Sequence, residues 1–514
     1  MRCKELSWVT IVVGIAVSSC GGGGGTASLM PALAQPTSVE TMPIAAPPAE
    51  PPAPPEPEER RAQDDRNLFV PADPTATTFA ALAAATSDSV DNASTSRWAG
   101  VLGGAAYHVE VPAQWNGKLV MYAHGYVPGD GNTLVITDPS IRRHLIQNGY
   151  AWAASSYSKN FYDVRVGVED TNALALEFNK IAKANGRELA APSKIYITGH
   201  SMGGHVAAAA IEDEVYATAN HKVRYDGAVP MCGVVGDTEL FDYFAGAQVT
   251  AQALAGLPKY PTMNWSDIES QVRATLFNDF RALPLPNIAT TAIGDKYASV
   301  IENLTGGPRP MFDLGFKSGG SFTAVWTVFG GDGTIDGILN GSVLDTYRFV
   351  YSIEDDLAGT AAINSSVIKL KPTPEANRLR RDGLRWIPKV NGQFKIPVVT
   401  LHTLGDLYVP FSMEQIYNRR VAANGNSDWL VQRAVRGISH CDFTQAEQIE
   451  AFDAMIKWER DGVKPEGDDV LTAATVAGVA YGCKFTRPPS GAVDEVPLIA
   501  FSRGIAASVE PCPS

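Results

Sequence analysis

The sequence lacks several features that would each indicate a common class of function. Beyond its first twenty residues it has no apolar run long enough to span a bilayer. It has no P-loop, and no G-x-G-x-x-G motif follows a strand-like segment, so no nucleotide cofactor is expected. Basic residues are outnumbered: 42 Lys and Arg stand against 55 Asp and Glu, and the formal net charge is −13. Because nucleic acids and anionic membranes are bound by clustered basic residues, neither is expected as the main partner.

The spacing of metal ligands is also poor. The segment from Gly331 to Gly337 has the Asp and Gly residues of a calcium loop, but Val343 stands where that loop needs a glutamate. We therefore predict no metal and no cofactor. What the chain does have is size, with 514 residues of which 45% are hydrophobic. That is enough for a large folded core, and too apolar for a chain that is disordered throughout.

The first 19 residues are typical of a signal peptide. Arg2 and Lys4 form a short basic start, and Trp8–Val17 is an apolar stretch too short for a transmembrane helix. The small residues before Cys20 resemble the bacterial lipobox, in which the signal is cut and the new N-terminal cysteine receives lipid. An ordinary secretory signal, cut near residue 19 or 27, is the alternative.

Residues 20–66 are predicted to be a lipidated, flexible, proline-rich linker. Ten of the 34 prolines fall between Pro31 and Pro57, and the linker has no aromatic residue. This composition favours an extended spacer. Gly21, rather than aspartate, follows Cys20, which favours anchoring at the outer membrane or cell surface; otherwise the protein is periplasmic or secreted. The membrane is then a partner only through the N-terminal lipid.

From residue 67 onwards, short β-rich runs alternate with helical patterns. Because the runs are apolar on both faces, they indicate an α/β fold with a mostly parallel sheet and helices on both faces. The alternation stops after Met231 and resumes near Ile396, so residues 233–395 are expected to form a large, mainly helical lid inserted between sheet strands. The core then comprises 67–232 and 396–514, which ends in a C-terminal tail. Strands are predicted at 106–111, 118–123, 151–155, 194–198, 227–231, 396–402 and 429–435, and helices at 141–148, 170–185, 202–219 and 413–423.

The strongest chemical signal is the segment Gly199-His-Ser201-Met-Gly203, which follows an Ile-rich strand and opens an Ala-rich helix. In this order the motif is a nucleophile elbow, a sharp turn that lifts the Ser201 hydroxyl above the sheet. A side chain at either glycine would collide with the turned backbone. The free amides at the start of the helix point towards developing negative charge. Ser201 is therefore the predicted nucleophile.

A serine nucleophile needs a histidine to take its proton and a carboxylate to orient that histidine. Of the eight histidines, His440 lies in the loop after the last predicted strand and is the expected base. Asp406 lies in the loop after the preceding strand and is the expected acid. Asp442, two residues beyond the histidine, and Asp237, after the strand that ends at Met231, are the alternatives.

Two backbone amides are expected to hold the oxyanion of the tetrahedral intermediate. One belongs to Met202, directly after the nucleophile. The other is expected in His124-Gly125-Tyr126, after the strand at 118–123, with Tyr126 as the donor and Gly125 leaving the approach clear. His124 itself is interpreted as structural, fixing this loop by a hydrogen bond.

These motifs resemble the α/β-hydrolase superfamily, in which nucleophile, acid and base follow one another in this chain order. More narrowly, the segments VPAQWNGKLV, MYAHGY, GHSMGGH and SHCDFT look like those of secreted bacterial serine hydrolases that include esterases and amidases. The resemblance covers roughly Ser96–Cys232 and Ile396–Trp458. It implies the α/β-hydrolase fold and does not specify a substrate.

Four of the six cysteines remain once the first leaves with the signal and the second carries lipid. An even number in an exported chain favours two disulfides, with three possible connectivities. The favoured pairs are Cys232–Cys441, which would hold the loop of the base to the sheet, and Cys483–Cys512, which would close the C-terminal tail. Free buried thiols are the alternative.

The leading hypothesis is an exported serine hydrolase that cleaves carboxylic esters, small or polymeric, through an acyl-enzyme intermediate. An amidase or aminopeptidase with the same triad is the second hypothesis. A non-catalytic surface lipoprotein that binds a partner is the third. Five aromatic residues of the lid are expected either to line an apolar substrate pocket or to form the core of the lid itself: Trp265, Phe277, Phe280, Trp326 and Phe329.

Overall fold

The computed structural model describes residues 79–513, apart from 129–133, 282–286, 318–320, 332, 334–337, 340 and 381–382. The predicted signal peptide (1–19), the predicted lipid attachment at Cys20 and the predicted linker (20–66) lie outside the described residues. Within the described ranges, every helix falls short of the length and apolar character that a membrane crossing requires.

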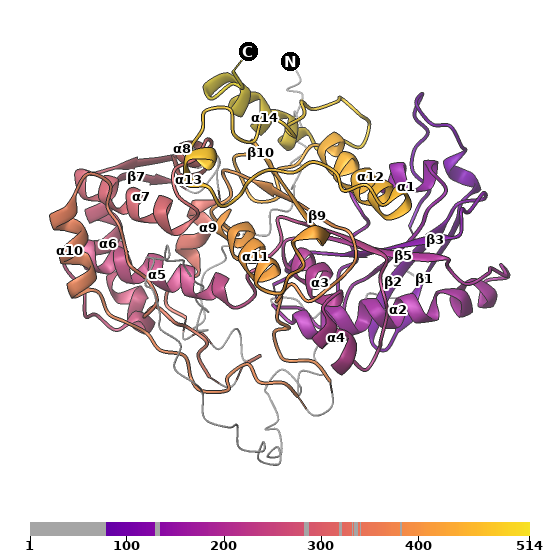
Figure 1. Cartoon of the computed structure of the whole chain (residues 1–514), viewed down its shortest axis with the longest axis horizontal. Coiled ribbons are helices and arrows are strands. Elements are labelled where there is room, and N and C mark those ends of the chain that lie inside the picture. The colour runs from indigo at the N-terminus through magenta and orange to yellow at the C-terminus, as the bar shows by residue number, and fades with distance from the viewer. Residues whose placement is uncertain are drawn as a thin grey trace, which may run out of the picture.

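An eight-stranded sheet lies at the centre of the molecule (Figure 1). Its strands follow the order β1-β2-β4-β3-β5-β6-β9-β10. All pairs from β4 to β10 are parallel, whereas β2 runs antiparallel to both β1 and β4. The predicted mostly parallel sheet is confirmed. Its strands are β1 (Ser96–Leu102), β2 (Ala105–Val111), β3 (Lys118–Ala123), β4 (Ala151–Ser155), β5 (Lys194–His200), β6 (Gly227–Met231), β9 (Val398–Thr403) and β10 (Leu430–Val435).

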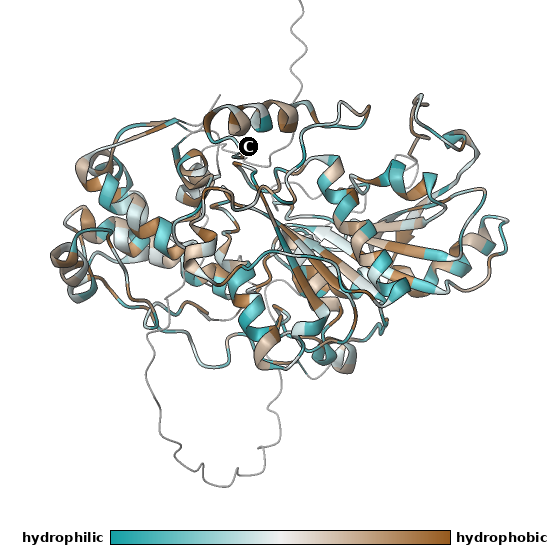
Figure 2. Cartoon of the chain, turned by 45° about the horizontal axis from the view of Figure 1, so that its top comes forward, coloured by the Kyte–Doolittle hydropathy of each residue, from teal (hydrophilic) through white to brown (hydrophobic). Residues whose placement is uncertain are grey.

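Residues that alternate along a central strand enter two separate hydrophobic cores. On β3, Leu119 and Met121 pack with α2, α3 and α11, whereas Val120 and Tyr122 pack with α1 and α12. Helices therefore cover both faces of the sheet, as predicted. Figure 2 shows the matching pattern of hydropathy, with brown strands inside and helices that carry both colours. These helices are α1 (Arg142–Gln147), α2 (Val164–Ala184), α3 (Met202–Ala210), α11 (Ser412–Ala423) and α12 (Gln445–Asp461).

Three elements differ from the sequence-based expectation. The edge strand β1 was not predicted, because its polar residues and glycine leave it without an apolar run. The helix expected at 170–185 begins at Val164, where the Asp163 side chain caps it by accepting a hydrogen bond from the Val166 amide. The helix expected at 202–219 is two helices, α3 and α4 (Asp213–Thr218). The break falls at Glu212, whose backbone is extended and whose buried carboxylate accepts hydrogen bonds from the amides of residues 392 and 393.

The chain between β6 and β9 forms a mainly helical body beside the sheet, at the left of Figure 1. We call residues 233–395 the insertion. Its described elements include an antiparallel hairpin of two short strands. They are α5 (Glu239–Leu254), a 3₁₀ turn (Thr262–Asn264), α6 (Trp265–Leu276), β7 (Phe277–Arg281), β8 (Asn287–Thr290), α7 (Ala292–Leu304), α8 (Phe312–Lys317), α9 (Phe322–Thr327) and α10 (Leu357–Ser366).

The C-terminal tail returns to the core and supports the loop that carries His440. Arg503 is buried; its guanidinium pairs with Glu447 of α12 and donates to the carbonyl oxygen of Asp442 at 3.1 Å. A disulfide joins Cys483 to Cys512. The tail contains α13 (Ala473–Val476) and α14 (Pro497–Val509). Outside the tail, two further 3₁₀ turns occur at Asn92–Ser94 and Ser427–Trp429.

Candidate active site

Ser201 occupies a sharp turn between β5 and α3. Its backbone has φ 58° and ψ −123°, a combination that residues other than glycine rarely adopt and that is typical of a strained functional turn. A Cβ on Gly199 would lie 2.2 Å from the carbonyl oxygen of Gly203, and a Cβ on Gly203 would lie 2.0 Å from that of Ala123. Both positions therefore require glycine. The geometry is that of the elbow expected from the sequence.

The structure brings Ser201, His440 and Asp406 together. His440 Nε2 lies 2.8 Å from Ser201 Oγ, and His440 Nδ1 lies 2.6 Å from Asp406 Oδ2. Asp406 follows β9 and His440 follows β10, so two neighbouring parallel strands deliver both side chains to the same edge of the sheet. Asp406 is fully buried, whereas Ser201 and His440 are partly exposed. Ser201 and His440 are therefore partly open to solvent, and the Asp406 carboxylate is shielded from it.

The surroundings of Asp406 keep its carboxylate charged. Burial raises its pKa, but the opposite charge and hydrogen bond of His440 and the amide of Val409 outweigh this and hold the pKa below its ordinary value. The second carboxylate oxygen, Oδ1, accepts hydrogen bonds from the amides of Tyr408 (2.9 Å) and Val409 (3.0 Å) and from the Ser321 hydroxyl (3.1 Å). Sequence reasoning missed Ser321, because no motif surrounds it and 85 positions separate it from Asp406.

The two alternative acids have other partners. Asp442 accepts hydrogen bonds from the amide of Ile438 (3.0 Å) and the hydroxyl of Ser502 (2.7 Å). Its carboxylate therefore links the His440 loop to the C-terminal tail. Asp237 is fully buried and accepts from Arg420 (2.6 Å), Lys389 (3.0 Å) and two backbone amides. Neither carboxylate is bonded to the imidazole, whose Nδ1 faces Asp406.

The loop after β3 lies against the nucleophile. A Cβ on Gly125 would lie 3.4 Å from Ser201 Cβ and 3.9 Å from Ser201 Oγ, so the loop backbone runs beside the hydroxyl. His124 Nδ1 lies 2.6 Å from the Gly125 carbonyl oxygen, and burial lowers the pKa of His124 and favours the neutral ring. Tyr126 follows this glycine, and Met202 begins α3 directly after the serine. The backbone at Gly125 and the N-terminus of α3 thus lie beside Ser201, and the role of the Tyr126 and Met202 amides as an oxyanion hole stays a prediction.

The histidines on either side of the elbow point elsewhere. His200 Nε2 lies 3.0 Å from Gln448 Oε1, and His205 Nε2 lies 2.8 Å from the carbonyl oxygen of Pro388. His205 is buried and His200 is half-buried, and the burial of each ring lowers its pKa to about 4. Both rings are therefore neutral at pH 7, and neither contacts the Ser201 hydroxyl through these bonds.

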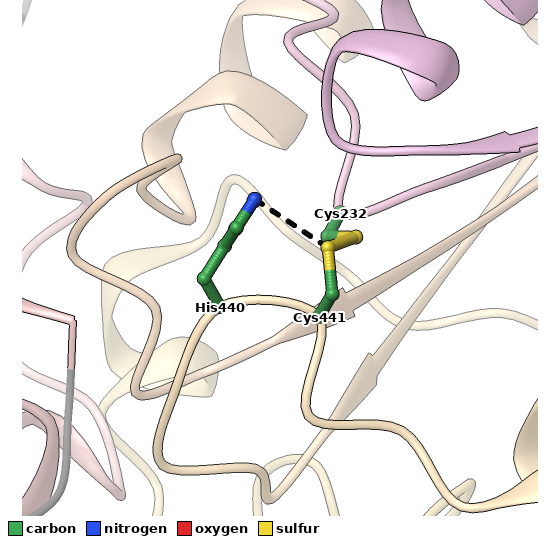
Figure 3. Close-up of side chains that lie close together, drawn as sticks. All are labelled: Cys232, His440 and Cys441. Carbon is green, nitrogen blue, oxygen red and sulfur yellow. Dashed lines mark hydrogen bonds between the residues drawn. A yellow bond between two sulfur atoms is a disulfide. The ribbon is translucent and has the colours of Figure 1, made fainter. Parts of the chain in front are cut away.

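A disulfide between Cys232 and Cys441 lies directly beside the base (Figure 3). Cys232 follows β6, Cys441 follows His440, and both cysteines have positive φ, at 42° and 54°. The Cys441 sulfur lies 3.4 Å from His440 Nε2. These three residues cluster closely enough to hold a metal ion, but the disulfide leaves neither sulfur as a thiolate, so in this form the cluster is not a metal site. Both favoured cysteine pairings are present in the structure.

The aromatic residues expected in the insertion mostly form its core. Trp265, Phe277, Trp326 and Phe329 are buried and pack edge-to-face or tilted against one another at centroid distances of 5.1–5.5 Å. Phe280 is half-buried. With the two tryptophans and several polar residues it lines a cavity of about 600 Å³ on the insertion. The core role is therefore found for four of the five residues, and the lining of a substrate pocket stays a prediction.

The chain was compared with known proteins. No family model matches it. The o-phthalyl amidase of Xanthobacter agilis is 32% identical over 98 residues, which are 19% of this chain and 22% of that enzyme. The chain thus matches about a fifth of the length of this relative.

Among solved structures, the feruloyl esterase B of Aspergillus oryzae is similar with a TM-score of 0.37 at 13% identity, over 72% of this chain and 81% of that one. An acylaminoacyl peptidase of Pyrococcus horikoshii has a TM-score of 0.33 at 10% identity, over 73% of this chain and 43% of that one. The fold follows from the chain's own geometry, namely the strand order, the antiparallel second strand and the elbow at Ser201. The chain has the α/β-hydrolase fold.

Proposed function

We propose that the protein is a serine hydrolase in which Ser201, His440 and Asp406 form the catalytic triad. One observation carries the proposal: an unbroken line of contacts runs from the Ser201 hydroxyl through His440 to the buried carboxylate, at 2.8 and 2.6 Å. The positive φ of Ser201 supports it, because such strain persists only where the surrounding structure enforces it and is concentrated at functional sites.

In this mechanism Ser201 Oγ attacks the substrate carbonyl carbon while His440 Nε2 takes the hydroxyl proton. Asp406 accepts the hydrogen bond from Nδ1 and stabilises the imidazolium that forms. The amides of Met202 and Tyr126 hold the oxyanion. The imidazolium then gives its proton to the leaving group, which departs and leaves the acyl group on Ser201. Water, activated by His440, releases the carboxylic acid and restores the hydroxyl.

The bond that we propose is a carboxylic ester, which is the leading hypothesis of the sequence analysis. An amide is the second candidate, because 98 residues of the chain are 32% identical to an o-phthalyl amidase. Both bonds suit the same triad, since the acyl-enzyme step is common to them and only the leaving group differs. The phthalyl group in that enzyme's name is accordingly a useful acyl group for the assay.

The test compares an ester and an amide that share one acyl group. p-Nitrophenyl esters and p-nitroanilides of acetic, butyric and phthalic acid are offered to the protein, and Ser201→Ala is the control. We expect ester hydrolysis that is faster than amide hydrolysis and that falls roughly 10⁴-fold or more in Ser201→Ala. Faster cleavage of the anilides would assign an amidase. Full activity of Ser201→Ala would refute the triad, and no activity on any acyl group would favour the non-catalytic hypothesis.

We also propose that the protein is exported and anchored by lipid on Cys20. Two disulfides in the described part of the chain support export, because disulfides persist in oxidising compartments. Detergent phase partitioning of the protein made in a bacterial host tests the anchor. We expect the wild type in the detergent phase and Cys20→Ser in the aqueous phase. A wild type that stays aqueous would indicate the secreted alternative.

A further inference from the structure

The insertion contacts the turn that carries the catalytic acid. We call residues 404–409 the acid loop. Arg309 Nε donates to the carbonyl oxygen of Leu404 at 2.8 Å, and the Tyr243 hydroxyl donates to that of Leu407 at 2.7 Å. Both donors belong to the insertion and both are buried. Two carbonyl oxygens of a buried turn, which would otherwise need water, are thus satisfied by side chains of the insertion.

Backbone packing ties the same two parts together. A Cβ on Gly315, in α8 of the insertion, would lie 2.1 Å from the carbonyl oxygen of Gly405. Helix α8 therefore approaches the acid loop as closely as a bare backbone allows. A lid that swings as one unit would have to break this contact and both hydrogen bonds.

Ser321 is the point at which the insertion reaches the acid itself. Its hydroxyl donates to Asp406 Oδ1 at 3.1 Å and accepts from the amides of Leu407 (2.9 Å) and Tyr408 (3.0 Å). A hydroxyl has one proton to donate and two lone pairs to accept, so these three contacts use its full capacity. Ser321 is only 8% exposed, so its side chain is largely shielded from solvent.

These contacts determine how the Asp406 carboxylate is turned. One oxygen, Oδ1, is held by Ser321 and by the amides of Tyr408 and Val409, which leaves Oδ2 to face His440. Without the Ser321 hydroxyl the carboxylate loses one of three donors on that oxygen. Its freedom to rotate away from the imidazole then increases.

We propose that Ser321 is a positioning residue for the catalytic acid, so that the insertion completes the catalytic site as a fixed part of it. The inference rests on the proposed function, because it assigns Asp406 its role in the triad. Ser321 touches no reacting atom and acts through Asp406.

The rate per folded molecule separates positioning from mere stability. A carboxylate that turns away from His440 Nδ1 stabilises the imidazolium of the transition state less, so kcat falls while KM changes little. A purely stabilising role would lower the amount of folded protein and leave kcat per folded molecule unchanged.

Ser321→Ala, Ser321→Thr and a control, Ser365→Ala, test the inference. Ser365 lies exposed on α10 of the same insertion and donates only to its own helix. We expect Ser321→Ala to lower kcat per folded molecule about tenfold with little change in KM. Ser321→Thr keeps the hydroxyl and should restore the wild-type kcat, and Ser365→Ala should match the wild type.

A folded Ser321→Ala variant with wild-type kcat would overturn the inference. If that variant does not fold, Ser321→Cys carries the same test, since a thiol keeps the volume and is only a weak donor. Ser201→Ala, assayed in parallel, separates the two claims. Retained activity in Ser201→Ala overturns the proposed function together with the inference. An inactive Ser201→Ala beside an unaltered Ser321→Ala overturns the role of Ser321 alone.

Discussion

Replacing Cys232 and Cys441 by serine removes the covalent link between β6 and the His440 loop. The link closes a segment of 209 positions, whereas Cys483–Cys512 closes one of 29. The chain-entropy relation gives upper values of about 5 kcal/mol for the first bridge and about 3.5 kcal/mol for the second. The two segments do not overlap, so the two losses of unfolding free energy should be independent.

The structure predicts that the two double variants differ far more in activity than in stability. The Cys441 sulfur lies 3.4 Å from His440 Nε2, so without the bridge the residue next to the base is free to shift. A misplacement of about 1 Å costs about 10²-fold in rate, so we expect Cys232→Ser/Cys441→Ser to lose about ten- to a hundredfold in kcat/KM. Cys483→Ser/Cys512→Ser should stay within about twofold of the wild type.

Urea unfolding followed by circular dichroism gives the two free energies, and initial rates on the best ester give kcat/KM. Rates are measured in buffer without denaturant, where both variants are folded. Equal activity of the two variants would refute the reasoning, because the bridge beside His440 would then be a stabilising link and nothing more. A loss confined to the Cys483–Cys512 variant would refute it as well.

Three further predictions follow from single positions. Gly203→Ala should fail to yield folded protein, because its Cβ would lie 2.0 Å from the Ala123 carbonyl oxygen; soluble expression with a wild-type melting temperature would contradict this. Asp406→Asn should lower kcat about 10⁴-fold with little change in melting temperature. A mild loss would indicate Asp442 or Asp237 as the acid instead. Asp237→Asn should lower the unfolding free energy at pH 7 by about 3 kcal/mol, because Arg420 and Lys389 lose the buried carboxylate that they share, while Arg420 keeps Glu239. That difference should shrink below about pH 4: burial raises the pKa of Asp237, but its cations outweigh this and hold the pKa below the ordinary value, so its contribution is lost as the carboxylate is protonated. A gap that stays constant with falling pH would contradict the last point.

Local patterns allowed much of the site to be predicted. The elbow lies within five consecutive residues, and the clash of a Cβ at Gly199 or Gly203 is a local event that the sequence already implies. His440 and Asp406 could be named because parallel strands deliver their following loops to one edge. The contacts of His440 with Ser201 and with Asp406 match that expectation, and the catalytic roles stay a prediction.

Long-range contacts set the limit of prediction. Ser321 reaches Asp406 across 85 positions, and nothing in its neighbours marks it. The helix expected at 202–219 breaks because the Glu212 carboxylate bonds two amides some 180 residues away. A helical pattern indicates propensity, and it does not reveal distant N–H donors that bind a side chain of the helix. The other partners of Asp442 and Asp237 are likewise long-range contacts that the sequence does not show.

The proposed mechanism requires above all that Ser201 is an activated nucleophile. An active-site-directed fluorophosphonate, followed by peptide mapping in a mass spectrometer, measures this without knowledge of the substrate. We predict one adduct per chain, on the Ser201 peptide, and a rate of labelling that falls sharply in His440→Gln while an exposed-loop variant labels as the wild type does. A protein that remains unlabelled, or one that is labelled equally fast without His440, would contradict the account.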